Sequence, residues 1–276
     1  MSFIWVVNPK SGLNISQSQS DRIDKAQSII SLVEEASKQG VCHLCGKEEV
    51  SREHAPSKAA FNTRDLIGLT VAQPLQKFLK WKPKVQQGGN VIKTLCKECN
   101  NHSGAWYNSA YVKLSKASSK YANENFAGKQ IGLRCSTYPL RIVKQALIHV
   151  VSSSQSGLTE YLPVLRGFLK NKEQSLEKAP FRVGLYVRAN TGARHSGLAF
   201  VAHGERVEVL SEFSFWPLGW VMVFGDASLD NLYDVTSWMR FGYHDKQEME
   251  LSVPCYWAVQ AYPKDFRSPR EVLNEG

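Results

Sequence analysis

Two Cys-x-x-Cys pairs restrict what this chain can fold into more than any other feature of its sequence. Cys42 and Cys45 form the first pair, Cys96 and Cys99 form the second, and residues 46–95 lie between them. Four thiolates in two such pairs are the ligand set of a closed tetrahedral zinc site. The spacing therefore predicts one structural zinc that holds the two ends of a long loop together. A thioredoxin-like redox role is disfavoured, because no strand–helix–strand pattern surrounds either pair.

The positive charge of the chain is concentrated around these cysteines. Residues 40–134 hold 15 Lys and Arg against 6 Asp and Glu, whereas the rest of the chain holds 19 of each. The formal net charge of +9 therefore arises in this segment alone. Such a field attracts polyanions, and neutralisation of phosphates by Lys and Arg gives sequence-independent affinity for nucleic acid. Charge by itself leaves a solvated basic surface as an equal alternative.

Composition limits the remaining classes. A length of 276 residues with 43% apolar residues predicts a globular chain of two domains. No run of about 18 apolar residues is present, so we expect no membrane-spanning helix. The first residues carry no basic leader or cleavage signature, which favours a soluble, cytoplasmic protein. Cys135 and Cys255 are expected to be buried free thiols.

The pattern of residues divides the chain into three segments. Residues 1–39 should be a polar arm followed by an amphipathic helix over 21–38 that ends at Gly40. Residues 40–134 should be a cysteine-containing domain, and residues 135–276 an α+β domain with a mostly antiparallel sheet. In the middle segment we expect a short helix over 57–69, a loop over 81–89, a strand over 91–95 and a helix from 101 past 111.

In the C-terminal segment, stretches with helical periodicity alternate with runs of aromatic and β-branched residues, which are typical of strands. The expected helices cover 141–151 and 158–169, and the expected strands cover 181–188, 198–203, 206–215, 220–225 and 256–262. Aromatic residues in strands pack in a core more often than they stack on bases, so we expect the former for Trp216, Trp220, Trp238 and Trp257. The role of this segment stays open between specificity, oligomerisation and control.

Two further motifs follow the cysteine pairs in a fixed order. Glu53-His54-Ala55-Pro56 comes eight residues after Cys45, and Asn100-Asn101-His102-Ser103-Gly104 follows Cys99 directly. In this order, residues 41–110 resemble the four-cysteine HNH endonucleases. The resemblance implies a treble-clef-like ββα-metal nuclease domain, clasped by a structural zinc, over residues 40–134. It also implies a metal-dependent endonuclease activity, with DNA as the favoured substrate.

The family pattern implies a general base and a residue that orients it. The His of Glu-His is the base, so this role falls on His54, and an imidazole suits proton abstraction near neutral pH. The middle Asn of the family corresponds to Asn90. Asn62 is the alternative, because the stretch from His54 to Asn90 is longer than in compact members.

The pattern also implies ligands for a catalytic Mg²⁺ or Mn²⁺. Glu53 and Asn100 would supply carboxylate and amide oxygens, which suit a hard cation, with Asn101 and His102 as close substitutes. Ser103 stands where many members place a Lys, so either the activity would be lower or the phosphate contact would move to Lys93 or Lys97. We expect phosphate contacts from five lysines near the site: Lys80, Lys82, Lys84, Lys93 and Lys97.

Free-standing proteins of this kind are often bacterial restriction or anti-phage effectors, and a defence role is therefore one expectation. A second subunit or homo-oligomer through residues 135–276 is another. A non-catalytic, zinc-stabilised nucleic-acid-binding module is the competing interpretation, in which Glu53 and His54 only close the knuckle. A protein–protein scaffold with an incidental basic face is the third.

Overall fold

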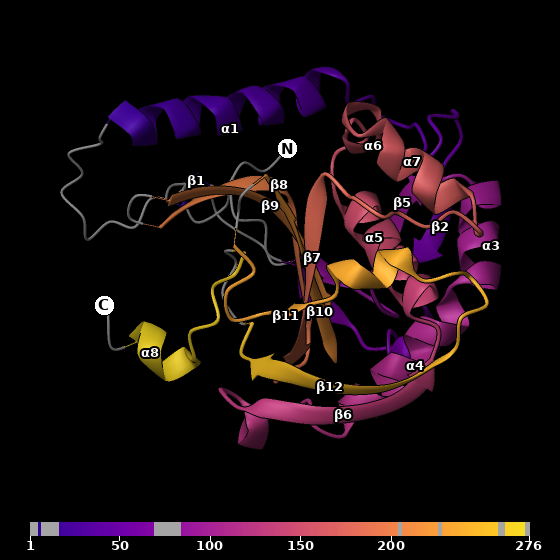
Figure 1. The fold of residues 1–276 in the computed structure, drawn as a ribbon, viewed down its shortest axis with the longest axis vertical. Coiled ribbons are helices and arrows are strands. Elements are labelled where there is room, and N and C mark those ends of the chain that lie inside the picture. The colour runs from indigo at the N-terminus through magenta and orange to yellow at the C-terminus, as the bar shows by residue number, and fades with distance from the viewer. Residues whose placement is uncertain are drawn as a thin grey trace.

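The computed structural model describes residues 5–6, 17–68, 84–203, 206–225, 228–258 and 263–273. A mostly antiparallel sheet lies at its centre, with helices around it, so the α+β class is confirmed (Figure 1). The strand order is β1-β8-β9-β10-β7-β12-β6, and β11 also pairs with β7. These strands are β1 (Trp5–Val6), β6 (Gln130–Thr137), β7 (Phe181–Arg188), β8 (Ala193–His203), β9 (Arg206–Phe215), β10 (Leu218–Phe224), β11 (Tyr233–Asp234) and β12 (Gln247–Tyr256).

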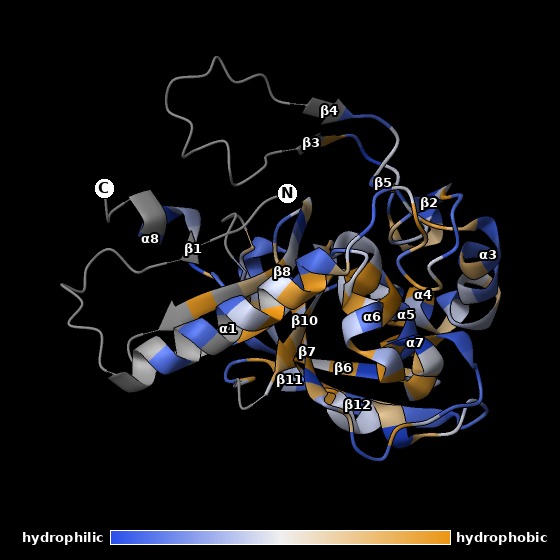
Figure 2. Cartoon of the chain, turned by 90° about the horizontal axis from the view of Figure 1, so that it is seen from above, coloured by the Kyte–Doolittle hydropathy of each residue, from blue (hydrophilic) through white to orange (hydrophobic). Residues whose placement is uncertain are grey.

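The central strands are the ones that the sequence predicts best. β10 is buried along its whole length and pairs antiparallel with β9, from Leu218 opposite Phe215 to Phe224 opposite Val209. Figure 2 shows the apolar residues that run along β10. Continuous apolar runs of this kind are typical of strands buried on both faces. The strands expected over 181–188 and 206–215 are confirmed with these bounds.

The edge of the sheet formed by β6 and β12 was not expected. β12 alternates buried Met249, Leu251 and Val253 with exposed Glu248 and Glu250, and β6 pairs with it along its length. Exposed charges on alternate positions are typical of a half-buried strand. They lower the mean hydropathy of the segment, so a search for apolar runs does not detect it. The strand expected over 256–262 is wrong at its start, because β12 ends at Tyr256; residues 259–262 lie outside the described residues.

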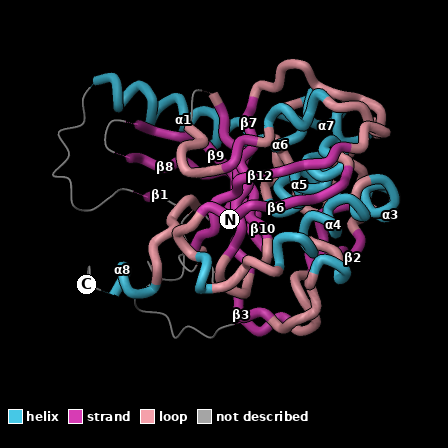
Figure 3. Tube along the Cα trace, turned by 60° about the horizontal axis from the view of Figure 1, so that its bottom comes forward, coloured by secondary structure: helices cyan, strands magenta, loops and turns pink. Residues whose placement is uncertain are grey.

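Most of the helices gather on one side of the strands in Figure 3, whereas α1 and α8 lie apart from this group. These helices are α1 (Gln17–Glu35), α4 (Asn108–Ser119), α5 (Pro139–Ser153), α6 (Leu158–Tyr161), α7 (Pro163–Lys170) and α8 (Pro269–Leu273), with 3-10 turns η2 (Glu124–Phe126) and η3 (Thr236–Arg240). The helix expected over 158–169 is divided in two at Leu162, because Pro163 begins a new helix at its first turn. α1 begins four residues before the expected helix.

One core cluster connects most of these elements. It contains Val33 of α1, Cys42 and Leu44 from the first cysteine pair, the apolar residues of α5 and the inner face of the large sheet. The boundary expected at residue 134 falls inside β6. A second cluster lies on the other face of the sheet, and includes Tyr186, Leu210 and Val221.

The burial of four tryptophans and two cysteines agrees with the expectation in part. Trp220 and Trp238 are buried, as expected, while Trp216 and Trp257 are half-buried. Cys255 is a buried free thiol and Cys135 is a half-buried one, and burial raises the pKa of both. In the described part of the chain, no helix combines the length and apolar character needed to cross a membrane.

Candidate metal centre and adjoining loop

The two Cys-x-x-Cys pairs meet in space. The first pair stands on a tight knuckle, where the Gly46 N–H donates to the Cys42 carbonyl (2.8 Å) and the Cys42 N–H donates to the Lys47 carbonyl (2.8 Å). Gly46 has a φ of +76°, a backbone conformation that favours glycine. In the second pair, Cys96 caps the N-terminus of α3 (Lys97–Trp106) and accepts a hydrogen bond from the Cys99 N–H.

The sulfur positions fit a tetrahedral zinc ion. All four Sγ atoms lie within 4.8 Å of one another, and Cys45 Sγ is 3.7 Å from Cys96 Sγ. Four sulfurs at about 2.3 Å from a tetrahedral centre are about 3.8 Å apart. Among the described residues, no other group of three or more His, Cys, Asp or Glu side chains converges in this way. The cluster is therefore suited to bind zinc.

The electrostatics of the cluster favour a cation. A hydrogen bond from the Cys99 thiol lowers the pKa of Cys42 to about 4, and the same interaction raises the pKa of Cys99. One thiolate thus suppresses the ionisation of its neighbours, because no positive charge lies among them. A zinc ion would supply that charge and allow all four sulfurs to ionise.

The knuckle is anchored to the rest of the molecule through its own backbone. The His43 N–H donates to the Thr94 carbonyl (2.8 Å), and the Thr159 hydroxyl donates to the His43 carbonyl (2.6 Å). His43 Nδ1 lies 3.1 Å from the Val151 carbonyl oxygen at the end of α5. The four-cysteine cluster is therefore joined to α5 and to α6.

A strand–strand–helix unit follows the knuckle. β2 (Ser51–His54) pairs antiparallel with β5 (Val91–Leu95), and α3 follows β5 and contacts both strands. The strand expected over 91–95 is confirmed, whereas the helix expected from 101 past 111 is interrupted at Tyr107. The helix expected over 57–69 is wrong: this stretch contains the 3-10 turn η1 (Lys58–Ala60) and β3 (Leu66–Gly68).

The loop expected over 81–89 contains a short strand. β4 (Lys84–Gln86) pairs with β3, and a turn joins it to β5, while residues 81–83 lie outside the described residues.

His54 is the last residue of β2 and is half-buried. Its backbone lies opposite Val91, and no hydrogen bond joins its ring to another described residue. Glu53, the residue before it on β2, is buried, whereas His54 is only half-buried. The imidazole is thus positioned by the strand but left available to a ligand.

Two asparagines fix the backbone directly after His54. Asn90 donates through Nδ2 to the Ala55 carbonyl (2.6 Å) and accepts from the Ala55 N–H (3.1 Å). Asn62 donates to the Pro56 carbonyl (2.6 Å) and accepts from the Asn90 N–H (2.5 Å). Both asparagines are buried, so the structure brings together the two residues that the sequence leaves as alternatives.

Gly89 is required by this arrangement. A β-carbon there would collide with the Asn62 side chain and backbone, and its φ is +104°. The left-handed φ and the close approach of Asn62 both favour glycine. The conformation of the loop after His54 therefore depends on Asn62 and on Gly89.

Glu53 is buried on the inner face of β2. The Thr94 hydroxyl donates to its Oε1 (2.9 Å), and no ion pair joins it to another described residue. Burial is the main cause that raises the pKa of this carboxyl to about 7. A buried carboxyl group without a counter-charge is the least expected feature of the site.

The asparagines and histidine after Cys99 lie on different sides of α3. Asn100 is half-buried on the first turn, whereas Asn101 is exposed. His102 is exposed, stacks on Trp106 with ring centroids 4.6 Å apart, and borders a small pocket with Cys45 and Lys170. Positions 100 and 102 are about 200° apart around a helix, so they do not face the same ligand.

The lysines expected to contact phosphate are only partly described. Lys93 and Lys97 are exposed on β5 and α3, and Lys84 begins β4. Lys80 and Lys82 lie outside the described residues.

No family model, curated protein or solved structure matches the chain.

Proposed function

We propose that residues 41–106 form a metal-dependent endonuclease site that hydrolyses phosphodiester bonds, with DNA as the substrate and His54 as the general base. The observation that carries this proposal is the placement of His54. Its ring has no hydrogen-bond partner among the described residues, while Asn90 holds both backbone groups of the next residue. Side chains that perform chemistry are held by a rigid frame and left open to substrate.

The proposed base acts on water. The His54 imidazole would accept a proton from a water molecule as its oxygen attacks the phosphorus, since imidazole titrates near neutral pH. Asn90 and Asn62 would act as positioning residues, because they hold the backbone that carries the imidazole. Four sulfurs around a zinc ion leave no open position for water, so the zinc is proposed as structural.

The proposed catalytic metal would be held by Glu53 and Asn100. Mg²⁺ keeps several waters and needs only one or two protein ligands, so a larger cluster of acidic residues is not required. Glu53 fits this role as a buried carboxyl without an ion pair, because a cation would supply its missing counter-charge. When bound, Mg²⁺ or Mn²⁺ stabilises the negative charge that develops on the phosphate and the leaving oxygen.

A non-catalytic nucleic-acid-binding module is the second candidate. The burial of Glu53 and its hydrogen bond from Thr94 favour this alternative, because they also suit a carboxyl that only joins β2 to β5. The same protein would then bind DNA with its zinc in place and leave the phosphodiester bonds intact.

Cleavage of a supercoiled plasmid separates these candidates. With Mg²⁺ or Mn²⁺ present, we expect the parent protein to cut and His54→Ala to be slower by about 10²- to 10⁴-fold, the usual effect of losing a general base. His102→Ala is the matched control, because that exposed imidazole stacks on Trp106 on the side of α3 away from Asn100, and it should cut at the parent rate. Binding without cleavage by the parent would select the non-catalytic module.

A further inference from the structure

Three lysines form a row along the exposed face of α4, which we call the α4 row: Lys113, Lys116 and Lys120. Spacings of three and four residues place them on one side of the helix. The opposite side is buried through Ala110, Tyr111 and Leu114, so the direction in which the row faces is fixed.

The charge of the α4 row is not compensated nearby. The sequence contains no Asp or Glu between Glu98 and Glu124, and no ion pair joins any of the three lysines to another described residue. Lys47, by contrast, is an exposed cation that is paired with Glu98 (2.7 Å). A row of unpaired cations is suited to a partner that carries regularly spaced negative charges.

The α4 row lies beside the loop that begins at His54. The turn η1 packs against α4, and Lys58 within it is also exposed. The Phe61 ring packs edge-on against Trp216, with centroids 4.9 Å apart, and Trp216 Nε1 donates to the Ala122 carbonyl just beyond α4 (2.8 Å). The loop is therefore attached to the same helix that carries the row.

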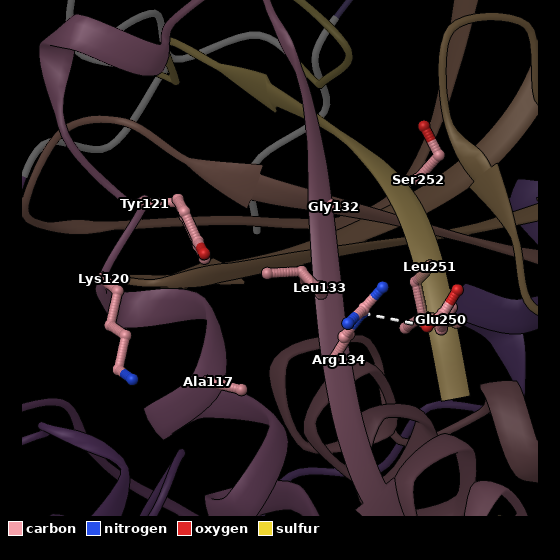
Figure 4. Close-up of a pocket in the computed structure, with 9 residues that line it drawn as sticks. All are labelled: Ala117, Lys120, Tyr121, Gly132, Leu133, Arg134, Glu250, Leu251 and Ser252. Atoms are coloured by element: carbon pink, nitrogen blue, oxygen red, sulfur yellow. Dashed lines mark ion pairs between the residues drawn. The ribbon is translucent and has the colours of Figure 1, made fainter. Parts of the chain in front are cut away.

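An open groove of about 590 Å³ lies at the C-terminal end of the α4 row. Figure 4 shows Ala117, Lys120 and Tyr121 on one side of this groove, opposite residues of β6 and β12. Arg134 on the β6 side is already paired with Glu250 (2.9 Å). Among the residues that line the groove, Lys120 of the α4 row is therefore the cation without an ion pair.

The dimensions of the row match a phosphate backbone. From Lys113 to Lys120 the helix rises by about 10 Å. The same length of duplex axis holds about three phosphates of one strand. Recognition of single strands relies on exposed aromatic side chains on which the bases stack. Among the described residues, the only large apolar side chain found exposed is Leu32 on α1, which is not aromatic. The described surface therefore favours a duplex over a single strand.

We propose that the α4 row contacts successive phosphates of one strand of duplex DNA and so positions the duplex over the loop that begins at His54. The choice of DNA rests on the proposed endonuclease function. The contact with phosphate rests on the α4 row alone, and it can be tested without cleavage.

The test measures binding in the full-length His54→Ala protein, without added Mg²⁺ or Mn²⁺, to a fluorescent 30-base-pair duplex at several salt concentrations. Replacing Lys113, Lys116 and Lys120 by Gln should weaken binding about 10-fold or more near 0.1 M salt. The slope of log affinity against log salt should fall by roughly 2–3, because each phosphate contact contributes about 0.9. The triple Lys→Arg variant should retain the affinity and the slope, which separates loss of charge from loss of folding.

The matched control removes the same charge elsewhere. Lys38, Lys178 and Lys246 are exposed on other segments, and their replacement by Gln should change the salt slope by less than about 1. Equal losses in the two triple variants would overturn the proposal, as would tighter binding of a single strand of the same length. Displacement of the duplex by poly-glutamate of matched charge would also overturn it, because the α4 row would then fit an acidic protein.

These outcomes are distinct from those of the proposed function. Row-dependent binding by a parent protein that never cuts supports the α4 row and contradicts the endonuclease. Cleavage that is unaffected by the three Gln replacements supports the endonuclease and contradicts the α4 row.

Discussion

Glu212 on β9 and Glu53 on β2 are both buried glutamates, but their surroundings differ. Glu212 Oε1 accepts hydrogen bonds from Arg194 (2.7 Å) and Tyr186 (2.5 Å), and its Oε2 accepts one from the Lys264 N–H (2.8 Å). Nearby, Lys264 Nζ pairs with Glu208 (2.6 Å). Glu53 accepts a hydrogen bond from the Thr94 hydroxyl (2.9 Å), and no cationic side chain among the described residues pairs with it.

The difference indicates which region is built for structure and which is open to a ligand. Buried charges that are fully paired with protein groups hold elements together, as Arg194 and Glu212 do on the far face of the large sheet. On the cysteine side, the four thiols and Glu53 share a lack of positive charge, and the His54 ring has no described partner. That side is therefore suited to cations that the chain itself does not supply.

The largest expected effect tests this dependence on a cation. Cys96→Ser should lose zinc and destabilise the fold by several kcal/mol, because the binding energy of a structural zinc is folding energy. Elemental analysis of the purified protein, followed by thermal unfolding, measures both quantities. Cys135→Ser is the control and should change neither. Zinc-free parent protein with normal stability would show that the four cysteines hold no structural metal.

The next effect concerns the paired carboxylate. Glu212→Gln should lower the free energy of unfolding by about 3–5 kcal/mol, because it leaves the buried Arg194 guanidinium without its counter-charge. Urea unfolding with zinc present gives the value. Lys47→Gln breaks an exposed pair with Glu98 and should leave stability almost unchanged, because those ions stay hydrated. Similar losses in the two variants would contradict the contrast between closed and open regions.

The smallest effect has the opposite sign. The pKa of Glu53 is raised to about 7 in the folded protein, so the folded state binds more protons than the unfolded state between about pH 4.3 and 7. Its contribution to stability is therefore present at low pH and is lost as the pH rises through 7. Glu53→Gln should stabilise the protein at pH 8 by about 1–3 kcal/mol, and have little effect at pH 4.

Urea unfolding at both pH values, with zinc but without Mg²⁺ or Mn²⁺, measures this change. The parent should gain stability at pH 8 when Mg²⁺ is added, whereas Glu53→Gln should not. A variant that is less stable than the parent at pH 8 would show that the ionised Glu53 is already compensated by the protein.

Several features of the fold follow from local sequence alone. The cysteine spacing predicts a cluster that the structure forms, and residues 91–95, 181–188 and 206–215 are strands because their own residues are apolar, aromatic or β-branched. These signals are readable because they arise within one turn or one strand. The α4 row has a local signal of the same kind, because its lysines recur at spacings of three and four.

Other features were decided only when distant segments met. Asn62 and Asn90 are 28 positions apart, and only the folded loop shows that both bind the backbone after His54. Glu53 and Glu212 look alike in sequence, but their burial and partners come from α5, Thr94, Arg194 and Lys264. The sequence by itself determined the four-cysteine cluster and the central strands, since these depend on local spacing and residue type. The tertiary structure alone decided which polar side chains are paired and which stay open, because desolvation and pairing depend on neighbours far away in the chain.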